Sequence, residues 1–380
     1  MLDITEFFGE TSGGVRTYLL QKARYVEARP WLRQVLLVPG PEDAIHATDG
    51  VRCYRLRGPA IPTQHPYRFM LATRSTSRVV AHEHPNLIEV GSTWLVPWLI
   101  RSANRELRIP TVWFYHSHFP RIVAPHPAKA GWARRTASAT AWRYVRRLGR
   151  LVGATLAPCE GVARELEAAG VERVCRVSLG VDLERFHPSR RLHAESTRRR
   201  FGLPDGPLAL YVGRFAREKD LDVLLAAWRD VRARTGATLA LVGDGPSREW
   251  LRRQPGAAGV LWLPFERDRD RLADLMAAVD LYIAPSPTET FGLAAHEALA
   301  SGVPVIAAEP GGVAESVQRS AAGAVFPAGD AGALAEVTTA IFQSDLHAFG
   351  ARGRAYVEEN HGWDTVFDRL FAVYRGVLAR

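Results

Sequence analysis

Short apolar runs of four or five residues alternate with longer stretches of helical periodicity along most of the chain. Such runs are typical of strands buried in a parallel sheet, whereas apolar residues spaced three or four apart indicate amphipathic helices. The alternation therefore predicts parallel, doubly wound α/β domains. The expected strands are residues 35–38, 78–81, 111–115, 154–157, 208–212, 238–242, 260–263, 281–284 and 303–307. The expected helices include residues 222–234, 271–278 and 294–300.

The chain has 380 residues, which is more than one ordinary core accommodates, so we expect two domains. Residues 186–207 are rich in proline, arginine and small polar residues and lack strong periodicity, which is typical of a boundary. We therefore expect an N-terminal domain at 1–185 and a C-terminal domain at 186–362. Residues 363–380 form an amphipathic pattern that predicts a terminal helix packed on either domain.

Charge is distributed unevenly between the two halves. Residues 1–185 hold 26 Lys/Arg and 16 Asp/Glu, a balance of +10, whereas the remainder holds 23 and 24, a balance of −1. The basic half favours an anionic partner, which could be nucleic acid, a membrane surface or an acidic substrate, with simple solubility as the alternative. Three separated cysteines argue against a disulfide framework or a zinc site. The first ten residues do not resemble a signal peptide, so we expect a cytoplasmic protein.

The basic half is centred on residues 129–150, which contain seven Lys/Arg and no acidic residue. Four arginines recur on one helix face: Arg143, Arg146, Arg147 and Arg150. An apolar stripe lies on the adjacent face: Trp142, Val145 and Leu148. This combination predicts an interfacial helix at an anionic membrane surface. The alternative is a helix that buries the stripe in its own domain and leaves the arginines in solvent.

Paired glycines, Gly13 and Gly14, follow the first apolar run and precede a helix that begins near Val15. Glycine lets the backbone approach a ligand, and a helix N-terminus offers free N–H groups to a phosphate. The segment is neither a GxGxxG fingerprint nor a P-loop, and a plain tight turn explains it equally well.

A second loop, residues 213–219, follows the expected strand 208–212. It carries Arg214 and Lys219, two cations that can neutralise a diphosphate at the carboxyl end of a strand. Only three of the 49 Lys/Arg residues are lysines, so a lysine in this loop indicates that a compact ammonium is required there. The alternative is chance placement at a solvated helix start.

Two carboxylates lie in residues 286–297, after the expected strand 281–284. Glu289 is expected in the loop, and Glu297 two turns into a helix beginning near Phe291. Carboxylates accept hydrogen bonds from sugar hydroxyls, and the first amides of the helix face an anion. The amides concerned are those of Phe291, Gly292 and Leu293. The alternative makes Glu289 a helix N-terminal charge and Glu297 a surface residue.

The order and spacing of these motifs resemble the family 4 retaining glycosyltransferases of GT-B fold over nearly the whole chain. The matching segments are Ser12-Gly13-Gly14-Val15, Tyr115-His116-Ser117, Gly180-Val181-Asp182 with Phe186 and Pro188, Gly213-Arg214 with Glu218-Lys219, residues 242–246, and Glu289 with Glu297. Within the family the chain is most similar to mannosyltransferases and sulfoquinovosyl-type transferases with lipid-linked or phospholipid acceptors. The resemblance implies two Rossmann-like domains facing across a cleft, with the C-terminal helix crossing back to the N-terminal domain.

The resemblance also implies a role for each matching residue. In the N-terminal domain, Gly13 and Gly14 would approach the donor diphosphate and His116 would contact the transferred sugar. The family usually has threonine where this chain has Ser117, and His118 ranks second to His116. In the C-terminal domain, the implied roles are a diphosphate clamp for Arg214 and Lys219, sugar binding for Glu289 with the amides of Phe291, Gly292 and Leu293, and ribose binding for Glu297.

The implied reaction is hexosyl transfer from a GDP- or UDP-sugar to a lipid, lipid-linked or glycan acceptor, with no cofactor and no metal ion. The triplet Asp268-Arg269-Asp270 has the form of a metal-binding Asp-x-Asp motif, but its neighbours Arg267 and Arg271 would repel Mg²⁺, so we expect a solvated helix start there. Front-face departure of the nucleotide is favoured, with double displacement as the alternative.

Two other functions are weighed against transfer. A nucleotide-sugar epimerase or hydrolase could use the same two domains without an acceptor. A non-catalytic membrane- or nucleic-acid-binding module would explain residues 129–150 but would leave Glu289 and Glu297 unused. Nucleic-acid motifs are absent from the sequence, so we expect no nucleic-acid partner. Peripheral attachment to the inner face of the membrane is one option for the predicted cytoplasmic protein.

Overall fold

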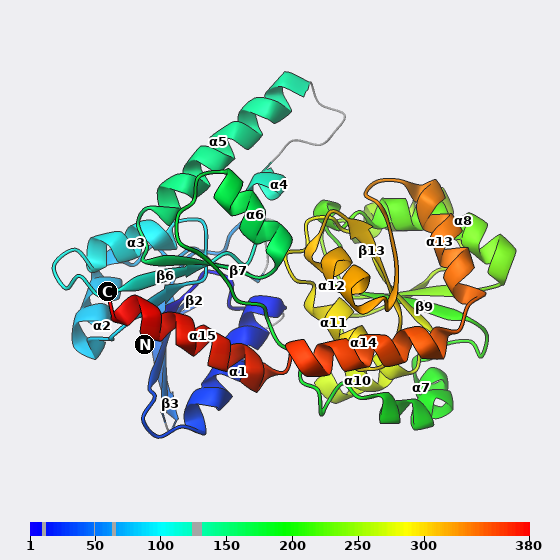
Figure 1. The fold of residues 1–380 in the computed structure, drawn as a ribbon, viewed down its shortest axis with the longest axis horizontal. Helices are drawn as coiled ribbons and strands as arrows, with labels where there is room; N and C mark the ends of the chain where they lie inside the picture. The colour runs from blue at the N-terminus through cyan, green and yellow to red at the C-terminus, as the bar shows by residue number, and fades with distance from the viewer. Residues whose placement is uncertain (10–12, 49, 63–65, 124–130) are drawn as a thin grey trace. The chain divides into compact units, whose positions relative to one another are not determined.

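The computed structural model describes residues 1–9, 13–48, 50–62, 66–123 and 131–380 and divides them into two compact units (Figure 1). Unit 1 comprises Met1–Ser178 and Asp364–Arg380, and unit 2 comprises Leu179–Trp363. Each unit is a mainly parallel sheet between two layers of helices, which confirms the expected pair of Rossmann-like α/β domains. Ser12 and Lys129, which the sequence motifs include, lie outside the described residues.

In the described part of unit 1, eight strands form one sheet in the order β3-β4-β2-β1-β5-β6-β7-β8. Neighbouring strands are parallel except β3 and β4. The strands are β1 (Leu2–Ile4), β2 (Gln34–Gly40), β3 (Ala44–Thr48), β4 (Val51–Arg57), β5 (Ile88–Val90), β6 (Thr111–Phe114), β7 (Ala154–Ala157) and β8 (Val174–Arg176). The helices are α1 (Gly14–Glu27), α2 (Thr73–Glu83), α3 (Val96–Ala103), α4 (Phe119–Val123), α5 (Gly131–Gly149), α6 (Glu160–Ala168) and α15 (Trp363–Leu378).

Strand β6 shows how the two helix layers of unit 1 are built. Trp113 faces a core cluster that includes Val145 and Leu148 of α5, whereas Phe114 packs against Tyr18 of α1. Successive side chains of a strand point to opposite faces, so the buried run 112–114 supplies both cores. Helix α15 covers the α1 side, where its apolar face is buried: Val366, Phe367, Leu370, Phe371, Tyr374 and Val377. The terminal segment is therefore a helix that packs on unit 1.

Unit 2, which is described throughout, has a parallel sheet of six strands in the order β11-β10-β9-β12-β13-β14. The strands are β9 (Leu208–Val212), β10 (Thr238–Val242), β11 (Leu261–Leu263), β12 (Leu281–Ala284), β13 (Val305–Glu309) and β14 (Gly323–Pro327). The α-helices are α7 (Ala194–Phe201), α8 (Leu221–Thr235), α9 (Arg248–Arg252), α10 (Arg269–Ala277), α11 (Leu293–Ala300), α12 (Gly312–Ser320), α13 (Ala331–Phe342) and α14 (Leu346–Asn360). Three short 3-10 helices are η1 (Pro188–His193), η2 (Arg217–Lys219) and η3 (Pro255–Ala257).

The two faces of β9 separate the cores of unit 2. Leu208 and Leu210 pack with α10, α11 and α12, whereas Ala209 and Tyr211 pack with α8 and α13. Because β9 pairs with β10 on one side and β12 on the other, the strand order reverses between β9 and β12. Doubly wound sheets bind ligands at this switch point, beyond the carboxyl ends of the two strands.

Several sequence expectations need correction. Residues 78–81 belong to helix α2 instead of a strand, because Thr76, Val79 and Val80 are buried at helical spacing. Residues 186–207 contain η1 and α7, and Arg198 fixes α7 by donating to Ala278 O and to the Asp280 carboxylate. The sequence analysis did not identify β1, β3, β4, β5, β8 and β14. Among the described helices, none combines the length and apolarity needed to cross a bilayer.

Candidate functional site

The switch point of unit 2 carries an ion pair. Lys219 ends η2 in the loop after β9, and Glu289 lies in the loop after β12. Lys219 Nζ lies 2.5 Å from Glu289 Oε1, and both side chains are partly exposed, at 21% and 30%. The two residues predicted from separate motifs therefore meet at one solvent-accessible position.

Hydrogen bonds hold these two loops together. The hydroxyls of Ser286 and Thr288 donate to the carbonyl oxygen of Glu218, at 2.6 and 3.1 Å. On the neighbouring strands, Tyr282 OH donates to Val212 O and Tyr211 OH donates to Arg214 O. The backbone beneath Lys219 and Glu289 is thus fixed from both strands, which preorganises the pair.

The predicted loop 213–219 is also supported by the loop after β10. Phe215 N donates to Asp244 O, and Gly213 N donates to Val242 O. A Cβ on Gly243 would approach Gly213 O to 2.0 Å, and the φ of Gly243 is +141°. Glycine is required there because of this close backbone approach. Arg214, in the same loop, is half-buried.

Two helix N-termini converge on the Glu289 loop. Gly292 precedes α11 in a left-handed conformation with φ +79°, and Gly312, the first residue of α12, donates its amide to Glu289 O at 2.9 Å. The first amides of a helix lack intrahelical partners and carry a partial positive charge. Of the predicted amide donors, Gly292 is the N-cap of α11 and Leu293 its first residue, whereas Phe291 is a buried anchor before it.

Glu297 is buried and paired with Arg269 instead of lying on the surface. It lies one turn into α11, not two, and Arg269 Nη2 donates to its Oε1. Burial raises the pKa of Glu297, and the guanidinium of Arg269 opposes that shift. Asp268 caps α10 by accepting from the amides of Asp270 and Arg271, so the Asp-x-Asp triplet is a helix start, as predicted.

His296 supports this loop from beneath, a role that the sequence analysis missed. Its ring stacks on Phe291 with centroids 3.8 Å apart, and its Nε2 lies 2.9 Å from Ser316 Oγ of α12. Complete burial lowers the pKa of His296 to about 4, so the ring is neutral near pH 7. The sequence analysis assigned a role to the adjacent Glu297, but nothing in the sequence distinguished His296 from a solvated residue.

In unit 1, the predicted glycines lie at the start of α1. Gly13 is its N-cap and Gly14 its first residue. Among the described residues, no atom lies within 4 Å of a Cβ built on either glycine, so packing against the described part of unit 1 does not require glycine at these positions. The first amides of α1 lack intrahelical partners, as at any helix N-terminus, and can serve an anion.

The two candidate histidines after β6 have different environments. His116 stacks on Phe114 with centroids 4.1 Å apart, and burial, with Lys22 next, lowers the pKa of His116 to about 3. His118 is buried, with Nε2 at 2.5 Å from Glu165 Oε2 and Nδ1 accepting from Arg121 N. Both ring nitrogens of His118 thus serve internal contacts, whereas His116 is a half-buried, neutral ring at the carboxyl end of β6.

A buried polar cluster lies behind His116, and the sequence analysis did not identify it. Lys22 Nζ is fully buried, 2.6 Å from Asp3 Oδ1 and 3.4 Å from Glu89 Oε2. It also donates to Tyr374 OH of α15, and Tyr18 OH donates to Glu89. The cluster ties α15 to α1 and the sheet. The scarcity of lysine in the chain was the only signal for it.

Helix α5 buries its apolar stripe and exposes most of its arginines. Val145 and Leu148 are buried in the core of unit 1, and Trp142 is half-buried against His118. This is the arrangement of the alternative considered for the stripe, so Trp142 is not a surface anchor. Arg143, Arg147 and Arg150 are exposed, Arg146 lies against Gly170, and Trp132 near the start of α5 is 70% exposed.

Two family models match the chain. Residues 12–185 match the model described as Glycosyltransferase Family 4, and residues 206–344 match Glycosyl transferases group 1. The chain is 32% identical to a GDP-mannose-dependent alpha-mannosyltransferase of Mycobacterium tuberculosis, over 90% of this chain and 86% of that protein. It is 31% identical to a GDP-mannose-dependent alpha-(1-6)-phosphatidylinositol dimannoside mannosyltransferase of the same species, over 83% and 81% of the two chains.

Other similar proteins include the sulfoquinovosyl transferase SQD2 of Arabidopsis thaliana, which is 30% identical over 70% of this chain and 51% of that protein. Among solved structures, a sucrose-phosphate synthase from Thermosynechococcus elongatus superposes with a TM-score of 0.80 at 23% identity, over 100% of this chain and 98% of that chain. The glycosyltransferase WaaG superposes with a TM-score of 0.72 at 16% identity, over 97% and 98%. These two similarities concern the fold alone.

Proposed function

The chain belongs to glycosyltransferase family 4, and on that basis we propose that it transfers mannose from GDP-mannose to a lipid or lipid-linked acceptor with retention of anomeric configuration. The observation that carries the proposal is the Lys219–Glu289 pair at the switch point of unit 2. A cation suited to a diphosphate and a carboxylate suited to sugar hydroxyls are held there side by side, as a nucleotide-sugar requires. The names of two mannosyltransferases similar to this chain support GDP-mannose as the donor.

In the proposed reaction, the bond between C1 of mannose and the β-phosphate oxygen breaks, and a bond forms between C1 and an acceptor hydroxyl oxygen. Departure and attack occur on the same face through an oxocarbenium-like state, and the hydroxyl proton passes to the departing phosphate oxygen. Lys219 and Arg214 stabilise the charge that develops on that phosphate. No step requires a metal ion, because Lys219 and Arg214 supply the positive charge that would otherwise neutralise the phosphate.

The remaining site residues bind the rest of the donor. Glu289 accepts hydrogen bonds from mannose hydroxyls while the first amides of α11 face the diphosphate. Glu297 binds the ribose hydroxyls, and Arg269 favours its ionised form. In unit 1, the backbone at Gly13 and Gly14 is assigned to the diphosphate and His116 to the sugar. Since the pKa of His116 is lowered to about 3, the ring acts as a neutral hydrogen-bonding group.

Acceptor delivery is assigned to unit 1 and an anionic membrane surface. The exposed arginines Arg143, Arg147 and Arg150 and the exposed Trp132 support this assignment. Each cation near an anionic leaflet contributes roughly 1 kcal/mol, so three of them provide reversible attachment.

A donor screen tests the proposed function. Purified protein should be stabilised against thermal unfolding by GDP and GDP-mannose and should convert GDP-mannose to GDP only when an acceptor lipid is present. Rapid hydrolysis without acceptor, or stabilisation by UDP but not GDP, would argue for the hydrolase or for another donor.

A further inference from the structure

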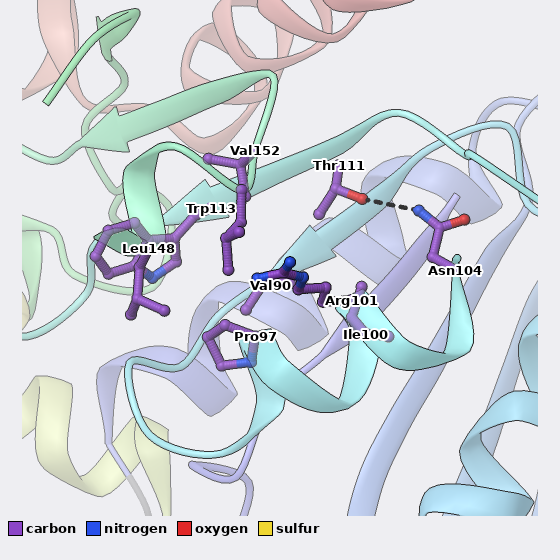
Figure 2. Close-up of a pocket in the computed structure, with 10 residues that line it drawn as sticks. Val90, Pro97, Ile100, Arg101, Asn104, Thr111, Trp113, Leu148 and Val152 are labelled. Atoms are coloured by element: carbon purple, nitrogen blue, oxygen red, sulfur yellow. Dashed lines mark hydrogen bonds between the residues drawn. The ribbon is translucent and has the colours of Figure 1, made fainter. Parts of the chain in front are cut away.

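Unit 1 contains a pocket between α3 and α5 that is lined by none of the residues assigned to the donor. Its volume is about 190 Å³. Figure 2 shows Trp113 and Leu148 at one end and the hydrogen-bonded pair Asn104 and Thr111 at the other, with Arg101 among the lining side chains. The floor is apolar and at most 2% exposed: Val90, Ile100, Trp113 and Leu148.

The polar rim leaves one charged side chain for a ligand. Asn104 is fully used, because Nδ2 donates to Ile109 O and Thr111 Oγ1 while Oδ1 accepts from Ile109 N. Arg101 is exposed at the rim and makes no ion pair among the described residues. Its guanidinium lies 6.0 Å from the Trp98 ring, and that of Arg147 lies 4.9 Å from the same ring. Two guanidinium groups therefore lie near the indole of Trp98, which follows the lining residue Pro97 in α3.

The charged residues around the pocket are almost all positive. The segments 96–111 and 143–152 contain seven arginines and a single acidic residue, Glu106. The ring of Trp113, which is 1% exposed, forms part of the apolar floor.

We propose that this pocket binds a single-chain anionic phospholipid, with its phosphate on Arg101 and its first acyl carbons on the apolar floor, which includes the Trp113 ring. A dry cavity of about 150 Å³ holds one benzene ring, so this pocket holds a chain segment of about seven carbons. The change from a cationic rim to an apolar floor matches an amphiphile and fits neither a sugar nor a nucleotide. The site lies beyond the proposed transfer reaction and does not depend on it.

The test uses the full chain with ¹⁵N-labelled tryptophan indoles, without any donor, and 1-octanoyl lysophosphatidic acid below its micelle concentration. The Trp113 cross-peak, assigned with Trp113→Phe, should shift saturably. Inorganic phosphate supplies only the anionic group, and octyl glucoside supplies only an eight-carbon chain. Neither should shift the Trp113 cross-peak. An equal shift with phosphate alone, or no saturable shift with the lipid, would overturn the proposal.

Variants separate the pocket from general attraction to basic protein. Arg101→Gln should weaken lysophosphatidic acid binding by at least about tenfold, the effect of one lost charge-assisted hydrogen bond. Arg105→Gln removes an equal charge from an exposed arginine that does not line the pocket and should leave binding unchanged. Leu151→Phe, which fills the pocket, should abolish binding in protein with an unaltered unfolding temperature. Equal weakening by Arg101→Gln and Arg105→Gln would contradict a specific site.

Discussion

Lys219 Nζ and Glu289 Oε1 lie 2.5 Å apart although 70 residues separate them in the chain. They meet because β9 and β12 are adjacent parallel strands whose following loops share one edge of the sheet. The pair means that each side chain positions the other before the donor arrives, and this coupling can be measured.

We expect Lys219→Ala to lower kcat at least about a hundredfold, since one preorganised donor to the transition state is lost. Glu289→Gln should also lower kcat strongly. Because the residues contact each other, the double variant should lose much less than the sum of the single effects in free energy. Steady-state kinetics of the four proteins measure this coupling, and strictly additive losses would show that the pair does not act as one unit.

Glu289 and Glu297 should act on different ends of the donor. Glu289→Gln is expected to leave GDP affinity within about threefold of wild type, because the sugar is absent from GDP. Glu297→Gln should weaken the binding of GDP by at least about tenfold, since a charged hydrogen-bond acceptor for the ribose is removed. Calorimetric titration with GDP measures both, and equal weakening by the two variants would refute the division of roles.

His296 should make the folded state less stable as the pH falls. A histidine in the unfolded chain takes up a proton near pH 6.5, whereas burial lowers the pKa of folded His296 to about 4. Between these values the unfolded state binds more protons, so the free energy of unfolding decreases as the pH drops through this window. When the pH is lowered from about 7.5 to about 5, the free energy of unfolding should therefore fall by about 2 kcal/mol less in His296→Gln than in the wild type.

Urea unfolding at the two pH values measures the effect. His82→Gln is the matched control, because His82 is an exposed histidine on α2 and should leave the pH dependence unchanged. An identical pH dependence for wild type and His296→Gln would mean that His296 does not remain neutral in the folded protein.

Attachment to anionic vesicles should depend on the exposed arginines of the α5 segment. Arg143→Glu, Arg147→Glu and Arg150→Glu combined should abolish co-sedimentation with vesicles containing anionic phospholipid at low salt, and wild-type binding should weaken as salt is added. The control changes the same charge on exposed positions of unit 2: Arg229, Arg234 and Arg253. If both triple variants lose binding equally, attachment follows net charge and not the surface of α5.

The sequence was sufficient to place Lys219 and Glu289, because each follows a short apolar run and the ends of parallel strands converge in a doubly wound sheet. The strands β7, β9, β10 and β12 match the expected ranges for the same reason, since each is a continuous apolar run. The helix α15 was predicted from its apolar face, whose residues recur every three or four positions.

Other features depend on contacts that local pattern does not encode. β1 and β5 are three-residue strands that carry Asp3 and Glu89, and these carboxylates are accommodated in the sheet only because Lys22 lies between them. The partner of Glu297 could not be predicted, because Arg269 belongs to a triplet whose acidic neighbours suggested a different chemistry. Trp142 was assigned to the surface because periodicity identifies an apolar stripe but not what covers it.

Product analysis tests the central claim most directly. Purified protein is incubated with GDP-[¹³C]mannose and an extract of membrane lipids in the presence of EDTA, and the anomeric carbon of the product is examined by NMR. The account predicts a lipid-linked α-mannoside, formed at the same rate with and without EDTA and at least about a hundredfold more slowly by Lys219→Ala. A β-mannoside, free mannose as the sole product, or a complete dependence on added Mg²⁺ or Mn²⁺ would contradict it.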